Sequence, residues 1–201
     1  MQIIKFDNRE SYMYGLQRYN GIEKEFIEAQ YYVSFDLDSV YSEFFTREII
    51  LIGSEIESAF KELCHRIDGS TPGNMCDYKS IILTHMPRIT EISVRNKQNG
   101  RCCYPFREWN DGKLHWWTVY TELKHNIVDE KANLGIALEM LQAYLLLLFC
   151  ITAMVSNVNI DYLHFPKLFE VDFSVGAAII PSMDYVIIYD RKELLNSLGY
   201  R

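Results

Sequence analysis

The chain has 201 residues, of which 49% are hydrophobic and 23% are charged. This composition is typical of one globular domain with a substantial core and excludes a disordered chain. A formal net charge of −7 disfavours a broad surface that coats nucleic acid, because an acidic protein repels polyanions at long range. This charge does not exclude a local basic pocket.

The cysteine pattern excludes the usual cysteine-based sites. The five cysteines form no CxxC motif and no paired Cys/His spacing, so the sequence predicts neither a disulfide framework nor a zinc site, and no cofactor. Cys102 and Cys103 are expected to be free thiols in a loop. The first residues become charged before an apolar signal segment could form, so we expect a cytoplasmic protein.

The first half of the chain contains one strong helical pattern. Residues 1–40 are weakly patterned, and Gln30 to Phe35 could be a short strand. From Ser42, a plausible N-cap, apolar residues recur at helical spacing until a Gly/Pro-rich segment at 69–73 ends the helix. These residues are Phe45, Ile49, Ile52, Ile56, Phe60, Leu63 and Ile67.

The middle of the chain is less regular. Met75 to Met86 is predicted to be a second helix closed by Pro87, a short strand is possible over 89–94, and 96–112 is predicted to be a loop. The basic residues Arg95, Lys97 and Arg101 in this loop could contact nucleic acid, or could simply form a solvated surface.

Two helices are predicted next, Leu114 to Asn126 and Lys131 to Ser156, with Asp129 as the N-cap of the second. The short link at 127–128 predicts an antiparallel pair. The apolar stretch at 140–155 is too short to cross a bilayer and contains a glutamine. We therefore interpret it as the buried central helix of a bundle and expect no membrane contact.

The end of the chain changes character. Segments 168–173 and 177–180 look extended, and 185–189 is rich in β-forming residues, with a turn at 181–184. A C-terminal β-hairpin is the natural interpretation. The sequence predicts a single, mainly α domain over 1–201, with a helical core at about 42–156 and a β appendage at about 157–201.

The most informative polar residues lie on the helix predicted at 114–126. At 100° per residue, one side of this helix and the stripe next to it carry a set of candidate binding or catalytic groups. These are Trp117, Tyr120, Thr121, Lys124, His125 and Asn126. A lysine and a histidine at a helix end could bind and turn over a phosphodiester. The alternative is that His125 interacts with the helix dipole and that Tyr120 and the tryptophans belong to the core.

This part of the sequence resembles the HEPN superfamily. Pro105-Phe-Arg-Glu-Trp109 is similar to the P-F-x-x-W segment of a prokaryotic subgroup. Trp117 to Asn126 is similar to its W-x(2–3)-Y-N-x-[LIV]-K-H-[DN] motif, and Ala132-Asn-Leu134 begins a similar following helix. The resemblance covers about residues 42–156, including Ser54-Glu-Ile-Glu57.

The resemblance implies a HEPN-like four- to five-helix bundle that forms a homodimer in which two motifs face each other. Active members are metal-independent endoribonucleases in defence systems, with a motif of the form R-polar-x(3–5)-H. Here Tyr120 stands where the arginine is expected, and Thr121 takes the polar position after it. His125 therefore matches the histidine of the nuclease motif, Lys124 matches the subgroup motif alone, and the arginine has no counterpart. Tyrosine offers no fixed positive charge to a phosphate.

Three functions follow as hypotheses. The first is a catalytically weak or inactive HEPN-like interaction module, dimeric through its aromatic-rich helices, in a prokaryotic defence or stress response, with RNA or a protein as partner. The second is an atypical endoribonuclease that uses His125 and Lys124 at a dimer interface. The third is a structural protein whose C-terminal hairpin pairs with a partner strand through an exposed edge at 185–189.

Overall fold

Helices dominate the protein, as the sequence predicted. The computed structural model describes residues 8–125, 132–154, 166–172, 180–181, 187–188 and 191–201. Within these ranges it contains six α-helices, a three-stranded antiparallel sheet and a two-stranded one. The mainly α class is therefore confirmed.

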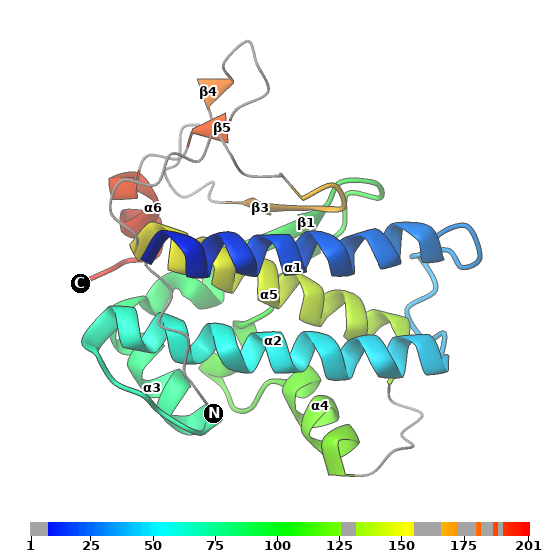
Figure 1. Ribbon diagram of the computed structural model, residues 1–201, viewed down its shortest axis with the longest axis horizontal. Helices are drawn as coiled ribbons and strands as arrows, with labels where there is room; N and C mark the ends of the chain where they lie inside the picture. Colours follow the sequence, from blue (N-terminus) through cyan, green and yellow to red (C-terminus); the bar gives the residue numbers. More distant parts are fainter. Residues whose placement is uncertain (1–7, 126–131, 155–165, 173–179, 182–186, 189–190) are drawn as a thin grey trace.

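Helix α5, Leu134–Met154, lies at the centre of the fold (Figure 1) and contacts α1, α2, α4 and α6. In the described part of the chain it is the one helix long and apolar enough to cross a membrane, but 89% of that stretch is buried inside the protein. Gln142, one of its buried polar residues, donates to the backbone oxygen of Val94 at 3.2 Å. The predicted buried central helix is confirmed.

Helix α2, Glu43–Asp68, has the ends that its sequence predicted. The Ser42 side chain accepts a hydrogen bond from the backbone N–H of Phe45, and Gly69 ends the helix with φ of 80°, a conformation that glycine adopts without strain. Its apolar face, which includes the fully buried Ile49, Ile52 and Ile56, packs against α5.

Helix α1, Asn8–Ala29, was not predicted, although Leu16, Tyr19, Ile22 and Phe26 follow helical spacing and are buried. Tyrosines that the sequence pattern left ambiguous supply part of its buried face. The predicted strand at 30–35 is wrong, because these residues form turns after α1, with Tyr32 N–H donating to the Ala29 oxygen.

The predicted helix at 75–86 is confirmed as α3, Met75–His85, capped by Asn74. A 3₁₀ turn, Pro87–Glu91, follows it, so the strand expected over 89–94 begins later, as β1, Ser93–Asn96. The proline fixes a φ compatible with this turn and lacks the N–H that a strand ladder needs.

Strand β1 is the middle of the three-stranded sheet. β2, Cys102–Cys103, and β3, Phe169–Asp172, pair with it antiparallel, with Val94 opposite both Cys103 and Val171. The extended segment predicted at 168–173 is thus confirmed over β3. All five cysteines are free, as predicted, but Cys102 and Cys103 form a strand and not a loop. A 3₁₀ turn, Arg107–Asn110, lies within the predicted loop.

Two predicted helix boundaries moved. The helix expected from Lys131 begins at Leu134, and Asn133 caps it by accepting from the Ile136 N–H at 3.0 Å, whereas the proposed N-cap Asp129 lies outside the described residues. Helix α4 is His115–His125. Asn126 and the link at 127–128 lie outside the described residues.

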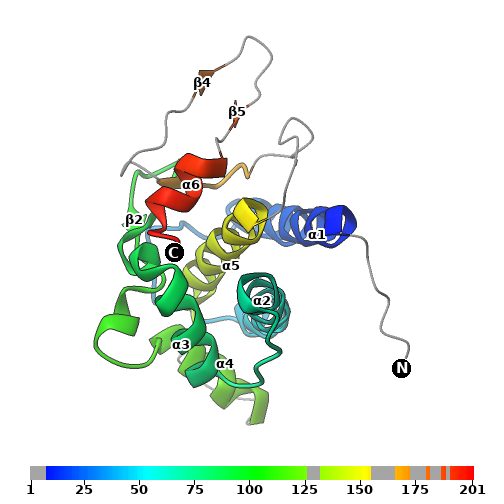
Figure 2. The same cartoon turned by 90° about the vertical axis from the view of Figure 1, so that its left-hand side faces the viewer.

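The predicted C-terminal hairpin is confirmed where the structure describes it. β4, Ile180–Pro181, pairs antiparallel with β5, Ile187–Ile188. Of the turn predicted at 181–184, Pro181 is part of β4 and the other residues lie outside the described ranges. Helix α6, Arg191–Ser197, was not predicted. Figure 2 shows α6 and β3 on the side of α5 that faces away from α2.

Candidate functional site

The loop before α4 and the first turn of α4 form one aromatic cluster. Trp116 is fully buried and its indole N–H donates to the backbone oxygen of Pro105 at 2.9 Å. The ring of Phe106 lies 6.1 Å from that of Trp116 and 4.7 Å from that of Trp109. The P-F-x-x-W segment therefore acts as a packing partner for the W-W-x-x-Y helix, and both hold α4 in place.

Tyr120 is a buried residue of the α2–α4 contact, with 1% of its surface exposed. Its ring lies directly on Gly53 of α2, where an added Cβ would fall 2.2 Å from the tyrosine Cδ2. Only glycine leaves room for the ring at this distance. The alternative interpretation of Tyr120 as a core residue is confirmed.

Glu57 of α2 joins the two polar groups of the motif. The Tyr120 hydroxyl donates to its Oε1 at 3.2 Å, and Lys124 Nζ donates to the same oxygen at 2.6 Å. The lysine Nζ also lies 5.2 Å from the centre of the Tyr120 ring. The hydrogen bond to Glu57 raises the pKa of Lys124, and burial is the main cause that raises the pKa of Tyr120.

This arrangement pairs Lys124, the cation that the motif was expected to offer a phosphate, with a carboxylate of the protein itself. Lys124 keeps 46% of its side chain exposed, so its charge is not sequestered from water, but its nearest anion is already a protein carboxylate. A phosphate would have to compete with Glu57 for it. Such a partly exposed pair links α4 to α2 with a modest energy and leaves Lys124 less available to an anion.

The remaining candidate residues, Trp117, Thr121 and His125, make contacts other than the Lys124–Glu57 ion pair. Trp117 is half-buried, with its ring 5.2 Å from the Tyr120 ring and 5.9 Å from the Phe60 ring. The Thr121 hydroxyl donates to the backbone oxygen of Trp117 at 2.8 Å, a bond internal to the helix. His125 is exposed at the last residue of α4, where the helix dipole favours a cation.

Sequence reasoning missed the roles of Gly53 and Glu57. The sequence places Glu57 in the long helix, two residues after Glu55, without indicating its partner. Because two residues span about 200° on a helix, these carboxylates serve different neighbours: Glu57 meets α4, and Glu55 binds Arg18 of α1 at 2.9 Å. A glycine inside a strong helical pattern is the signal that could have located the close approach.

The basic loop at 95–101 is not an open cationic patch. Arg95 pairs with Glu170 at 2.5 Å, Lys97 donates to the backbone oxygen of Pro166 at 2.6 Å, and Arg101 pairs with Asp38 at 3.2 Å. Each cation thus has a partner within the protein, which weakens the nucleic-acid interpretation of this loop. Among the described residues, no three His, Cys, Asp or Glu side chains lie together as a metal site would require.

Comparison of the chain with models of protein families, with characterised proteins and with solved structures finds no match. The residues themselves therefore carry the functional argument.

Proposed function

We propose that this protein is a cytoplasmic, HEPN-like helical-bundle interaction module, homodimeric and without efficient nuclease activity, that serves a prokaryotic defence or stress response. The observation that carries the inactivity is the pairing of Lys124 with Glu57 at 2.6 Å, next to a buried Tyr120. An RNase built on this motif needs a cation aimed at the phosphate, and here that cation is engaged and the arginine position is inside the core.

The burial of the aromatic residues bears on where the proposed dimer contact lies. Trp109, Trp116 and Tyr120 are buried within one protomer, so the aromatic side of α4 serves internal packing and does not supply a dimer interface by itself. The exposed end of α4, with Thr121, Lys124 and His125, is the part of the motif that a second protomer could face.

The alternative is an atypical metal-independent endoribonuclease that uses His125 and Lys124 across a dimer interface. One observation favours it: His125 is exposed and next in sequence to Lys124, so a general acid or base would be accessible to RNA.

RNA cleavage separates the two functions. Wild type, His125→Ala and Lys124→Ala are incubated with single-stranded and stem-loop RNA in chelator, and the rate is compared with buffer alone. We expect all three proteins to match the buffer. Chelator-resistant cleavage by wild type that His125→Ala abolishes would establish the ribonuclease instead. Sedimentation of the same proteins tests the dimer.

A further inference from the structure

The turn after α1 exposes large apolar side chains that the fold does not use. Tyr31 and Tyr32 are 84% and 91% exposed, and Leu37, five residues later, is 53% exposed. Neighbouring exposed aromatic residues are typical of protein interfaces, because a tyrosine ring provides a large apolar area together with a polar group and few rotatable bonds.

A hollow of about 420 Å³ opens beside Tyr32, between the end of α1 and the start of α2. Val33, Val40 and Phe44 give it apolar walls, and Glu25 and Glu28 lie on its α1 side. Beneath it, the buried ring of Phe26 lies 5.9 Å from that of Phe44, so the walls are backed by the packed core.

A second hollow, of about 580 Å³, shares Tyr32 and Val33 with the first. Its other lining residues are mostly polar, among them Gln30, Ser34 and Asn99. Tyr32 therefore stands between an apolar hollow and a polar one. An extended segment of another protein could place an apolar side chain in the first and its backbone or polar groups along the second.

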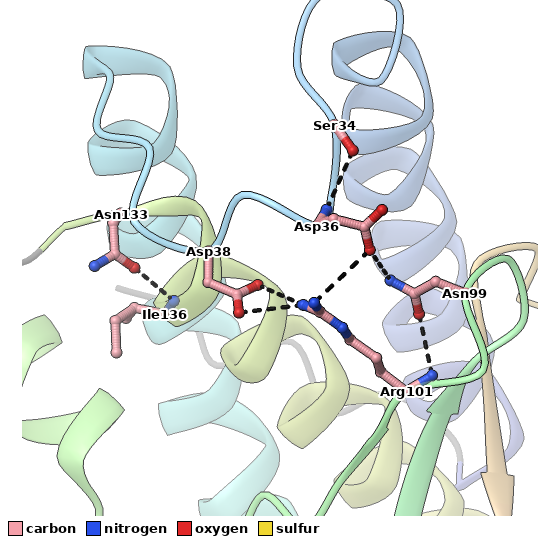
Figure 3. A network of polar contacts seen from close by, with 7 residues as sticks. All are labelled: Ser34, Asp36, Asp38, Asn99, Arg101, Asn133 and Ile136. Carbon is pink, nitrogen blue, oxygen red and sulfur yellow. Dashed lines mark hydrogen bonds and ion pairs between the residues drawn. The ribbon is translucent and has the colours of Figure 1, made fainter.

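The loop that carries this surface is held in place on two sides (Figure 3). Arg101, after the β1–β2 turn, donates to both carboxylate oxygens of Asp38 at 3.2 Å, and Asn99 donates to Asp36 at 3.1 Å. The N–H groups of Leu134 and Gly135, at the start of α5, donate to the backbone oxygens of Val40 and Asp38. A surface fixed in this way loses little conformational freedom when it binds.

The charges around the hollow indicate what kind of partner fits. The charged residues that line it are Glu25 and Glu28, both acidic. Glu28 keeps 56% of its side chain exposed although it pairs with Lys24 at 3.6 Å. Glu25 lies close enough to Glu48 of α2 to help raise its pKa, although burial is the larger cause. Glu48 is 2% exposed, and within the described part of the chain its Oε2 has no hydrogen-bond partner. An incoming cation is attracted here, whereas a nucleic acid or a second copy of this acidic chain is repelled.

We propose that this aromatic–acidic surface, formed by Tyr31, Tyr32, Leu37, Glu25, Glu28 and the apolar hollow, docks a segment of a partner protein. The segment presents an apolar side chain to the hollow and a neighbouring Lys or Arg to Glu25 and Glu28. The inference rests on the proposed interaction function and names the chemistry of the partner.

The test uses a phage-displayed library of random 12-residue peptides, panned on the full chain, followed by calorimetric titration of a synthetic peptide that it selects. We expect selected sequences that place an apolar residue next to Lys or Arg. Tyr32→Ala and the double variant Glu25→Lys/Glu28→Lys should each weaken binding about tenfold or more, which is the range of interface hot spots. Raising the salt concentration should weaken binding to wild type as well.

Matched controls lie elsewhere on the surface. Tyr14→Ala removes a tyrosine that is 49% exposed at the other end of α1, and Glu91→Lys reverses a charge whose side chain is 61% exposed in the turn after α3. Both should bind the peptide within about twofold of wild type, since mutations outside an interface leave most of the affinity intact. Unchanged circular dichroism and unfolding midpoints verify that the docking variants fold.

Selection of no sequence family, or of acidic or uncharged sequences, would overturn the proposal, as would a peptide that the docking variants and controls bind equally. Loss of the dimer in Tyr32→Ala by sedimentation would assign the surface to a second copy and overturn it too. The proposed function fails on a different readout, chelator-resistant RNA cleavage that depends on His125, so the two failures are distinguishable.

Discussion

Helix α2 carries two carboxylates, Glu57 and Glu48, whose burial and polar partners differ. Near its middle, Glu57 accepts from Tyr120 and Lys124, and the facing ring lies on Gly53 with no space between them. Near its start, Glu48 is more deeply buried: its Oε1 pairs with Arg47 at 3.2 Å, and its Oε2 has no hydrogen-bond partner among the described residues. Phe44 and Phe45 of the same helix line the hollow beside the exposed Tyr32. The first carboxylate accepts from two donors, whereas the second pairs with one cation and leaves one oxygen without a partner in the described part of the chain.

The motif suggests α4 as the region that binds a ligand or partner, whereas this difference favours the end of α1. Residues that resemble a catalytic motif turn out to be engaged in holding α4 against α2. Residues in a segment with no motif, at the end of α1, leave apolar area exposed beside the acidic Glu25 and Glu28. Unmatched groups on a well-braced surface are better evidence of binding than a partial motif whose polar atoms already have partners.

The largest expected effect tests the close packing of α4 on α2 near Glu57. Gly53→Ala should destabilise the protein by about 1–3 kcal/mol, because the new methyl group overlaps the buried Tyr120 ring. Gly21→Ala in α1 is the control: its Cβ meets nothing within 4 Å, so better helix propensity should stabilise the protein by about 0.5–1 kcal/mol. Urea unfolding measures both, and the same sign for both would refute the close contact.

A smaller effect is expected at Glu48. Burial raises its pKa above the unfolded value, and the ion pair with Arg47 at 3.2 Å offsets only part of this rise. The ionised carboxylate therefore destabilises the folded state at pH 7, and this cost disappears as pH falls below the unfolded pKa. Glu48→Gln should therefore stabilise the protein at pH 7 by about 1 kcal/mol, with no gain near pH 4. Unfolding in urea at both pH values measures the difference.

The control for Glu48 lies on the same helix. Glu43→Gln removes an exposed charge from the first turn of α2, where a negative side chain interacts favourably with the helix dipole. It should destabilise the protein by a few tenths of a kcal/mol at pH 7. A gain in both variants would mean that general acidity, and not the unpaired oxygen of Glu48, sets the effect.

The smallest effect concerns the ion pair of the motif. A double-mutant cycle with Lys124→Met and Glu57→Gln should give a coupling of about 0.5 kcal/mol that decreases in 0.5 M salt, because the lysine is half exposed. The looser pair Lys24–Glu28, at 3.6 Å with both side chains largely exposed, should give almost none. A coupling above about 2 kcal/mol would indicate that the pair is shielded from water and that a phosphate could displace Glu57 from Lys124 far less readily.

Local signals made part of the fold predictable. Ser42 and Gly69 mark the ends of α2 by their own hydrogen bonding and backbone conformation, and the apolar run of α5 announces a buried helix whatever surrounds it. Helix α1 was missed because the tyrosines and glutamates of its sequence look polar in isolation. Tyr19 is fully buried only because its hydroxyl, 3.2 Å from Glu23, finds a buried acceptor one turn away.

The candidate site was predictable only as a list of side chains. Its defining contact joins Lys124 to Glu57 across 67 residues, and neither helix pattern says which face of α2 meets α4. The same holds for β3, whose strand character was visible while its pairing with β1 was not. Whether a polar residue is available for chemistry depends on such distant partners, which periodicity does not encode.

The position of α5 in the chain has a consequence for synthesis on the ribosome. The apolar face of α2 is covered by a helix that is completed about 90 residues later, which at about 5–20 residues per second corresponds to about 5–20 s. During that interval Ile49, Ile52 and Ile56 lack their final covering. The nascent chain is therefore a natural substrate for chaperones that hold exposed apolar helices until the second half of the protein emerges.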